Sequence, residues 1–291
     1  MQAVAVTAYH KFDQLEKLVS ILSERFEVFV HIDRKAAGSF APPGPRVHCY
    51  SEYRVNWGGC NHLRAILFLM REALKDPAVD RVHLISGEDW PVRNPAEIEA
   101  RYEGRNDIDI LCTRFSKMTE EWYGVCRDWQ QLYHWYDVLD YKKISNKVIL
   151  KVLLGAQKLL RVDRYRKVPG ILGDGELAQG LVWGSYPRDA IEYCLRWNRE
   201  HPELLKFLAD GQAPEEYFFH TILSNSPEFE PRITNRHLRY MNWTVKNGSY
   251  PGILDMDDFQ PIETGDWCFC RKVDLGISKE LLAALHEAHG V

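Results

Sequence analysis

Short apolar runs alternate with amphipathic helical patterns in the opening part of the chain. Residues 3–9 and 26–33 are rich in β-branched and other apolar residues, and residues 12–24 between them place apolar side chains at helical spacing. Residues 61–76 repeat the helical pattern, and residues 79–90 contain a further apolar run. Because strands joined by such crossovers lie parallel, the alternation predicts an α/β fold in which helices flank a largely parallel sheet.

The polar ends of two predicted strands indicate where a ligand would bind. One run ends at His31-Ile-Asp33 and another at Ser86-Gly-Glu-Asp-Trp90. In open parallel sheets, ligands bind at the carboxyl ends of the strands. We therefore expect the functional site at this edge of the sheet, where both ends carry carboxylates.

Length, charge and missing motifs limit the classes of function. The 291 residues, 45% of them hydrophobic, suffice for one domain with a sizeable core. A formal net charge of -4 gives no overall positive field for a nucleic-acid backbone, so we expect no nucleic-acid partner. The sequence also lacks the Gly-rich loops of nucleotide triphosphatases and dinucleotide enzymes, and the Gly-x-Ser-x-Gly turn of hydrolases.

Two adjacent carboxylates, Glu215 and Glu216, are the candidates for acid–base chemistry. They stand at the start of a predicted apolar helix that contains Phe218, Phe219 and Ile222. One of the two can point into a cleft while its neighbour meets solvent. The alternative interpretation is that both carboxylates only stabilise the positive end of the helix macrodipole.

Two Asp-x-Asp triplets are candidates for a metal site. Asp107-Ile-Asp109 and Asp255-Met-Asp257 could hold a divalent cation against a diphosphate through hard oxygen ligands. The first triplet precedes an apolar run, so it also fits the charged start of a strand. The triplets alone do not decide between the two interpretations.

Six short segments carry a family pattern in a fixed order. They are HIDRK at 31–35, VNWGG at 55–59, LISGEDWP at 84–91, PEEYFFHTI at 214–222 with NSP at 225–227, LRYMNW at 238–243, and FCRKVD at 269–274. Together they resemble the core-2/I-branching N-acetylglucosaminyltransferases and the related peptide O-xylosyltransferases. The resemblance covers most of the chain, except residues 115–169.

This resemblance implies a single nucleotide-sugar-binding domain of the GT-A type. Residues 1–114 would bind the nucleotide, residues 115–169 would form a variable basic helical segment, and residues 170–291 would hold the catalytic and acceptor-binding part with an irregular C-terminal lobe. The implied reaction is inverting transfer of a sugar from a UDP donor to a hydroxyl. The resemblance also implies that neither a metal nor another cofactor is required.

The family's functional residues have counterparts in this sequence. Glu216 matches the catalytic base, and Lys272 matches the lysine that neutralises the donor diphosphate. Asp33 falls in the motif at the nucleotide, while Glu88 and Asp89 fall in the loop that faces the donor sugar and the acceptor. These residue types also fit the reaction chemically. One carboxylate can take the proton from an attacking hydroxyl, and a fixed ammonium can stabilise the leaving diphosphate in place of a metal.

Two positions depart from the family pattern. The branching enzymes pair the diphosphate lysine with an arginine, and Ser249 stands near that place here. Arg239 and Arg271 are therefore the candidates for a second UDP-binding cation. The xylosyltransferases carry an acidic residue in a strand that here reads Gly180-Leu-Val-Trp183, which weakens a literal xylosyltransferase assignment.

Trp90 and Trp243 are candidates for stacking on a sugar, because carbohydrate sites favour flat apolar platforms, although each could also belong to the core. We expect UDP-N-acetylglucosamine or UDP-xylose as the donor, and a glycan or glycolipid of surface polysaccharide synthesis as the acceptor. Two alternatives stay open: a catalytically silent glycan- or nucleotide-binding protein on the same scaffold, and a metal-dependent transferase that uses Asp107 and Asp109.

Residues 142–167 form a basic segment, which contains nine Lys or Arg residues and one Asp, interleaved with Leu, Ile and Val. This pattern fits a solvated helix face or an interfacial helix that attracts anionic lipid. The N-terminal residues lack a signal-peptide pattern, and seven irregularly spaced cysteines are typical of reduced thiols. We therefore expect a cytoplasmic protein with peripheral contact at the inner face of the plasma membrane.

Overall fold

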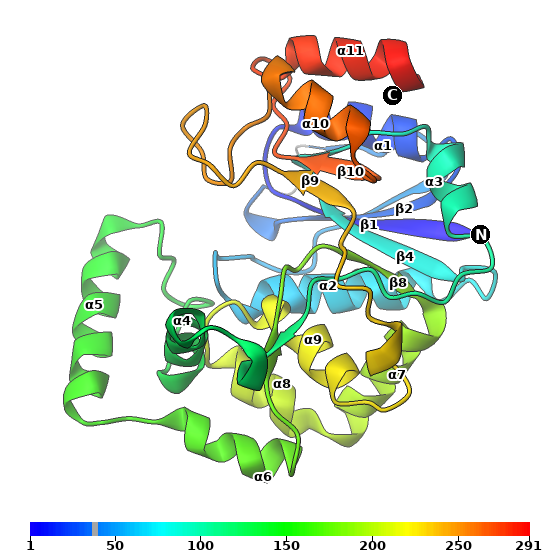
Figure 1. Ribbon diagram of the computed structural model, residues 1–291. Helices are drawn as coiled ribbons and strands as arrows, with labels where there is room; N and C mark the ends of the chain where they lie inside the picture. Colours follow the sequence, from blue (N-terminus) through cyan, green and yellow to red (C-terminus); the bar gives the residue numbers. More distant parts are fainter. Residues whose placement is uncertain (37–39) are drawn as a thin grey trace.

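A mostly parallel five-stranded sheet forms the centre of the protein. The computed structural model describes residues 1–36 and 40–291 (Figure 1). The strand order is β3-β2-β1-β4-β8, with the first four strands parallel and β8 antiparallel to β4. The strands are β1 (Gln2–Ala8), β2 (Glu27–Ile32), β3 (Val47–Tyr50), β4 (Arg81–Ser86) and β8 (Gly184–Pro187). The predicted α/β sheet flanked by helices is thus confirmed, while its GT-A type stays a prediction.

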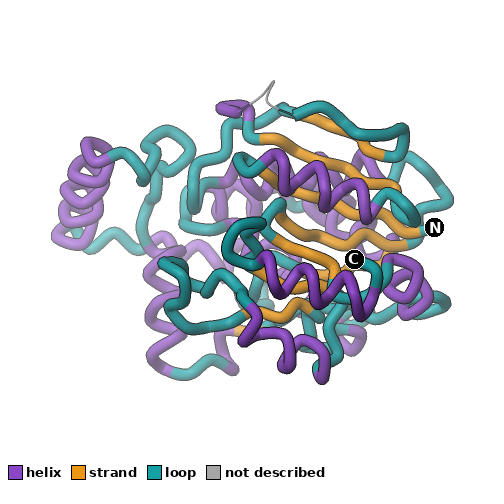
Figure 2. The backbone as a smooth tube through the Cα atoms, turned by 90° about the horizontal axis from the view of Figure 1, so that it is seen from above, coloured by secondary structure: helices purple, strands orange, loops and turns teal. Residues whose placement is uncertain are grey.

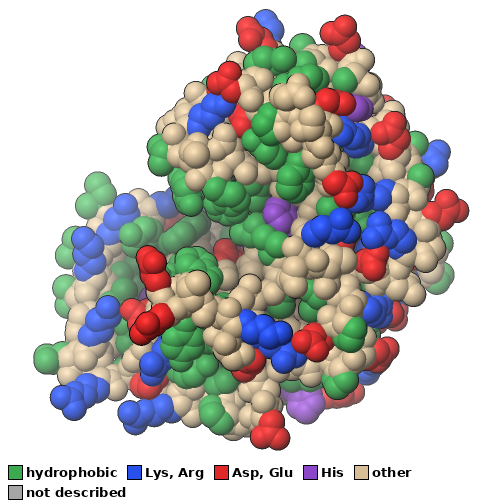
Figure 3. All heavy atoms as spheres, in the orientation of Figure 1, with side chains coloured by type: hydrophobic (Ala, Val, Ile, Leu, Met, Phe, Trp, Pro, Cys, Tyr) green, Lys and Arg blue, Asp and Glu red, His purple; other side chains and the backbone are tan. Residues whose placement is uncertain are grey.

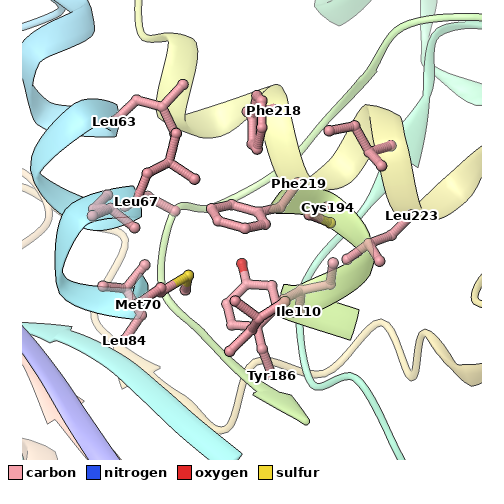
Figure 4. Close-up of a cluster of buried hydrophobic side chains, with 14 of the residues drawn as sticks. Leu63, Leu67, Met70, Leu84, Ile110, Tyr186, Cys194, Phe218, Phe219 and Leu223 are labelled. Atoms are coloured by element: carbon pink, nitrogen blue, oxygen red, sulfur yellow. The ribbon is translucent and has the colours of Figure 1, made fainter. Parts of the chain in front are cut away.

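One hydrophobic core lies against the face of the sheet that carries Ala3 and Ala5; we call it the α2 core. Figure 4 shows Leu63 and Met70 of α2 facing Phe219 of α9 and Tyr186 of β8. All four side chains are at most 1% exposed. Most of its helical members come from α2 (Cys60–Ala73), α7 (Arg188–Glu200), α8 (Pro202–Ala209) and α9 (Phe218–Ser224).

A second core, the α1 core, lies against the opposite face. Val4 and Val6 belong to it, because successive side chains of a strand point to opposite faces. The remaining members come from both ends of the chain, so the C-terminal helices pack beside the first helix (Figure 2). The helices of this core are α1 (Phe12–Leu22), α3 (Pro95–Arg101), α10 (Phe259–Thr264) and α11 (Lys279–His289).

A three-stranded sheet corrects two predictions. Its order is β5-β10-β9, formed by β5 (Asp89–Pro91), β10 (Phe269–Arg271) and β9 (Arg239–Met241). The apolar run at 79–90 is therefore not one strand, because β4 ends at Ser86 and β5 joins the other sheet. At the break, the backbone N–H of Ser86 donates to the Asp89 carboxylate at 2.8 Å. The C-terminal lobe is also more regular than predicted, because it contains β9, β10, α10 and α11.

The segment 115–169 is largely helical: part of it packs in the α2 core through Phe115, Cys126 and Val168, and one helix projects from the body. The segment contains α4 (Glu120–Gln131) and α5 (Ile144–Leu159), and α6 (Val168–Leu172) begins at its end. In Figures 1 and 2, α5 stands at the left edge of the molecule. The short strands β6 (Thr113–Arg114) and β7 (Ala178–Gln179) pair antiparallel on either side of this segment. Over the described residues, no helix is both long and apolar enough to cross a membrane.

Candidate functional site

The carboxyl ends of the parallel strands face a hollow in the surface. These strands run from right to left in Figure 1, and Figure 3 shows the surface hollowed between the part that carries β9 and β10 and the part that carries α4 and α5. Two cavities elsewhere, of about 400 Å³ beside α5 and about 620 Å³ beside β6, contain none of the predicted site residues. The candidate site is therefore this open hollow.

Glu216 is held by the buried amide of Gln179. A left-handed residue, Ala213 (φ 51°), turns the chain into the single 3-10 turn Pro214–Glu216, which precedes α9. Gln179 of β7 donates from Nε2 to Glu216 Oε2 at 2.8 Å. Part of Glu216 remains accessible. Even so, burial raises its pKa to about 8, with a further increase from the negative Glu215 and a decrease from the Gln179 hydrogen bond.

The neighbouring carboxylate, Glu215, points to a different partner. Glu215 Oε1 lies 3.1 Å from His62 Nδ1, and His62 Nε2 lies 3.2 Å from Thr7 Oγ1 at the end of β1. Because an ionised carboxylate only accepts, Nδ1 donates to Glu215 and Nε2 can accept from the threonine hydroxyl. Glu215 is thus tied to the central sheet, whereas Glu216 is the carboxylate that remains for a ligand.

Trp183 connects the carboxylates to the cationic side of the hollow. Its ring lies 6.1 Å from the His62 ring, and the Arg271 guanidinium lies over it at 4.4 Å from the ring centroid. The residues from Glu215 through His62 and Trp183 to Arg271 therefore form one continuous group of contacts. The sequence did not indicate His62, Gln179 or Trp183 as parts of the site, because their partners are far away along the chain.

Lys272 follows β10 on the cationic side. Its ammonium donates to Ser249 Oγ at 3.0 Å and to the Tyr250 carbonyl at 3.4 Å. Burial lowers its pKa; the negative Glu88 opposes this, and the positive Arg271 and Lys11 lower the pKa further. A cation in such surroundings is stabilised by an added anion, because the anion would offset both the burial and the neighbouring positive charges.

The structure separates the two candidates for a second cation. Arg239 is 1% exposed, and its guanidinium donates to Ser185 Oγ at 3.0 Å and to the carbonyls of Gly184 at 2.7 Å and Leu84 at 3.3 Å. Its predicted role in UDP binding is therefore corrected: it ties β9 to the central sheet. Arg271, which is 7% exposed, has buried Nε and Nη1 atoms without a hydrogen-bond partner among the described residues.

The loop after β4 contains three predicted site residues with different environments. Glu88 stays at the hollow, where its carboxylate lies 3.3 Å from Lys11 Nζ. Asp89 is fully buried, accepts from Ser86, and lies 3.5 Å from Arg271 Nη1. Burial raises the pKa of Asp89, and the positive Arg271 opposes this. Its predicted contact with a sugar is corrected, because this carboxylate is inaccessible and instead orients Arg271.

The two tryptophans predicted to stack on a sugar, Trp90 and Trp243, differ in exposure, and Asp33 is held by the backbone. Trp90 is 4% exposed within the α1 core, so it is corrected to a core residue. Trp243 is 49% exposed and lies beside Tyr250, with 5.9 Å between ring centroids. Asp33 lies at the end of β2, where Oδ1 accepts from the backbone N–H groups of Lys35 and Val55 at 3.0 and 3.1 Å. The roles of Trp243 and Asp33 in binding stay predictions.

The first Asp-x-Asp triplet does not form a paired metal site. Asp107 accepts from Arg105 Nε at 2.7 Å, whereas Asp109 is fully buried and accepts from Thr234 Oγ1 at 2.7 Å. Nor is it the start of a strand, because Ile108 and Asp109 make only isolated bridges. Among the described residues, no three His, Cys, Asp or Glu side chains are grouped so that they could hold a metal ion.

Known proteins share the pattern of this chain. A family model described as "Branch: Core-2/I-Branching enzyme" matches residues 3–263. Xylosyltransferase 2 from Rattus norvegicus is 26% identical over 94% of this chain and 32% of its own length, and Xylosyltransferase 2 from Homo sapiens is 26% identical over 94% and 31%. Beta-glucuronosyltransferase GlcAT14B from Arabidopsis thaliana is 28% identical over 38% of this chain and 25% of its own length. The chain spans about a third of the length of the xylosyltransferases that it matches.

Proposed function

The chain belongs to the Core-2/I-branching enzyme family, and on this premise we propose that it is an inverting glycosyltransferase that uses a UDP-sugar without a metal. The observation that carries the proposal is one chain of contacts with a carboxylate of pKa about 8, Glu216, next to one end and the cations Arg271 and Lys272 at the other. The two ends are joined through Trp183 and His62.

In the proposed reaction, one bond forms as another breaks. The acceptor hydroxyl attacks the anomeric carbon of the donor, its proton passes to Glu216, and the bond to the diphosphate breaks with its electron pair on the leaving UDP. Lys272 and Arg271 stabilise the charge that develops on the leaving phosphate. Because these cations supply the electrostatic role that a metal would otherwise have, the reaction needs no divalent ion.

The proposed donor and acceptor rest on the family and on the names of the relatives. The relatives named above are xylosyl- and glucuronosyltransferases by name. We propose UDP-xylose or UDP-N-acetylglucosamine as the donor, and a glycan or glycolipid of surface polysaccharide synthesis as the acceptor. A screen for UDP release across nucleotide sugars, with and without simple acceptors, tests the proposal. Binding of UDP without release from any donor–acceptor pair would instead favour a catalytically silent binding protein.

Chelation tests the metal independence. We expect the rate of UDP release to be unchanged in excess EDTA, because the positive charge at the leaving group comes from Lys272 and Arg271. The measurement is a comparison of initial rates after dialysis against the chelator. Loss of activity that manganese restores would contradict this expectation and show that the reaction depends on a divalent ion.

The pH dependence tests the identity of the base. Glu216 must be ionised to accept a proton, so kcat/KM should rise with pH through a pKa near 8. Replacing Gln179 by Leu removes a hydrogen bond to the ionised form, which should raise this pKa and lower the rate at pH 7. Replacing Glu215 by Gln removes a neighbouring negative charge and should lower the pKa. At a pH well below the pKa, raising the pKa by one lowers the ionised fraction about tenfold.

The proposal predicts that the midpoint of the pH profile moves up in Gln179→Leu and down in Glu215→Gln. A merely structural role for Gln179 and Glu215 would change the plateau rate but leave the midpoint of the pH profile in place. A midpoint that moves in the same direction in both variants would remove Glu216 from the proposed role.

A further inference from the structure

The outward face of α5 is apolar although it is exposed to solvent. Along this helix only Leu150 and Gln157 are buried, and Gln157 exchanges hydrogen bonds with the backbone of Tyr133 at 2.8 and 3.0 Å. The positions two residues away from these lie about 200° around the helix and therefore point outward. The outward side chains are Ile144, Val148, Val152 and Leu159, which are 81%, 58%, 66% and 85% exposed.

A row of lysines runs beside this apolar face. Lys147, Lys151 and Lys158 recur at helical spacing, and Figure 3 shows cationic and hydrophobic side chains interleaved along the left edge of the molecule. The segment 142–167 carries a net charge of +8, from nine Lys or Arg residues and one Asp, whereas the whole chain carries -4. The rest of the chain therefore carries -12. Positive charge is concentrated in the segment that contains α5, and Lys147, Lys151 and Lys158 are its cations on the helix itself.

We propose that α5 docks this protein onto an anionic lipid bilayer. A solvated helix face would expose polar side chains, whereas this face exposes four aliphatic ones that would enter the boundary between head groups and acyl chains. The lysine stems can lie along that boundary while their ammonium groups meet the phosphates. The acidic remainder of the chain would be held away from such a surface, so charge also fixes which side faces the lipid.

The start of α5 lies near the proposed site, so docking of α5 would also position that site relative to the bilayer. The segment before α5 lies across the carboxyl edge of the sheet: Tyr141 packs on Trp57 with 5.6 Å between ring centroids, and Lys142 Nζ lies 4.6 Å from the ring centroid of Tyr9 after β1. Since α5 begins at this edge, docking would bring the hollow close to the bilayer. A membrane-bound acceptor would then be presented to the proposed site.

Vesicle sedimentation of the full chain tests the proposal without any sugar transfer, so its failure would leave the proposed function standing. At low salt we expect binding to vesicles of mixed phosphatidylglycerol and phosphatidylcholine, little binding to phosphatidylcholine alone, and release as salt increases. Each cation near an anionic surface is worth roughly a factor of five, so replacing Lys147, Lys151 and Lys158 by Glu should lower the partition coefficient by on the order of 100-fold.

Two further variants separate the contributions. Replacing Val148, Val152 and Leu159 by Ser keeps every charge and should lower binding roughly tenfold, because less apolar surface enters the lipid. The matched control replaces three exposed cations on α7 and α8 by Glu, which gives the same change in net charge on another face and should leave binding nearly intact. These control residues are Arg196, Arg199 and Lys206.

Several results would overturn the proposal. One is wild-type protein that ignores both kinds of vesicle, including the case in which it binds a soluble anionic polysaccharide instead. Another is a control variant that loses as much binding as the lysine variant, since this would mean that net charge alone acts. A third is a wild-type dimer in sedimentation velocity that the serine variant converts to a monomer without any vesicle binding, which would assign the apolar face to a second copy of the chain.

Discussion

Replacing Glu216 by Gln is expected to lower kcat by roughly 10²–10⁴-fold, while the affinity for UDP changes little. The amide retains the size of the side chain and can still bond Gln179, but it cannot accept a proton from the acceptor. The binding of UDP should persist, because the proposed diphosphate cations lie on the other side of Trp183. Initial rates of UDP release and a calorimetric UDP titration measure the two quantities separately.

Glu215 supplies the matched control for this experiment. Glu215→Gln makes the same chemical change one residue away, on a carboxylate that is engaged by His62. At its own optimal pH this variant should keep most of the wild-type turnover. Equal losses in the two variants would mean that the carboxylates act as a unit, and near-normal turnover of Glu216→Gln would remove it as the base.

Lys272→Ala is expected to weaken UDP binding and to lower kcat/KM by roughly 10²–10³-fold. The charge that Lys272 meets grows as the bond to the leaving phosphate breaks, so the loss should be larger in the transition state than in the bound donor. Calorimetry with UDP gives the first effect and single-turnover rates give the second.

The control for Lys272 must separate charge from loop packing. The Lys272 ammonium also bonds Ser249 and the Tyr250 carbonyl, so its removal could loosen the loop between β9 and α10. Ser249→Ala removes one loop contact but leaves the charge, and it should preserve UDP affinity. If Ser249→Ala loses as much affinity as Lys272→Ala, then the loop, and not the ammonium, binds the donor.

Local pattern was enough to predict four elements near the start of the chain. The period of apolar residues marks β1, α1, β2 and α2 because each buries a single face or is buried on both. The break between β4 and β5 was not predicted, because it depends on the contact of Asp89 with Ser86 and with Arg271 on a strand far away in the sequence. The strands β9 and β10 are only three residues each, which is too short for a periodic signal.

The candidate site shows the same division between local and distant information. The family motifs indicated Glu216 and Lys272, and the structure adds Gln179 as the hydrogen-bond partner of Glu216. The sequence could not rank Arg239 against Arg271, since both occupy short strands. The carbonyl groups around Arg239, which are distant in sequence, distinguish the two. The contact between His62 and Glu215 joins residues 153 positions apart, so no local pattern could reveal it.

The two hydrophobic cores divide the proposed reaction between them. Glu216 precedes the helix whose phenylalanines fill the α2 core, whereas Lys272 follows a strand packed in the α1 core. Because packing is felt most strongly by immediate neighbours, a substitution in the α2 core is expected to act mainly on Glu216, and one in the α1 core mainly on Lys272. The stacking of Arg271 on Trp183 is the contact through which a change in one core would reach the proposed residue of the other.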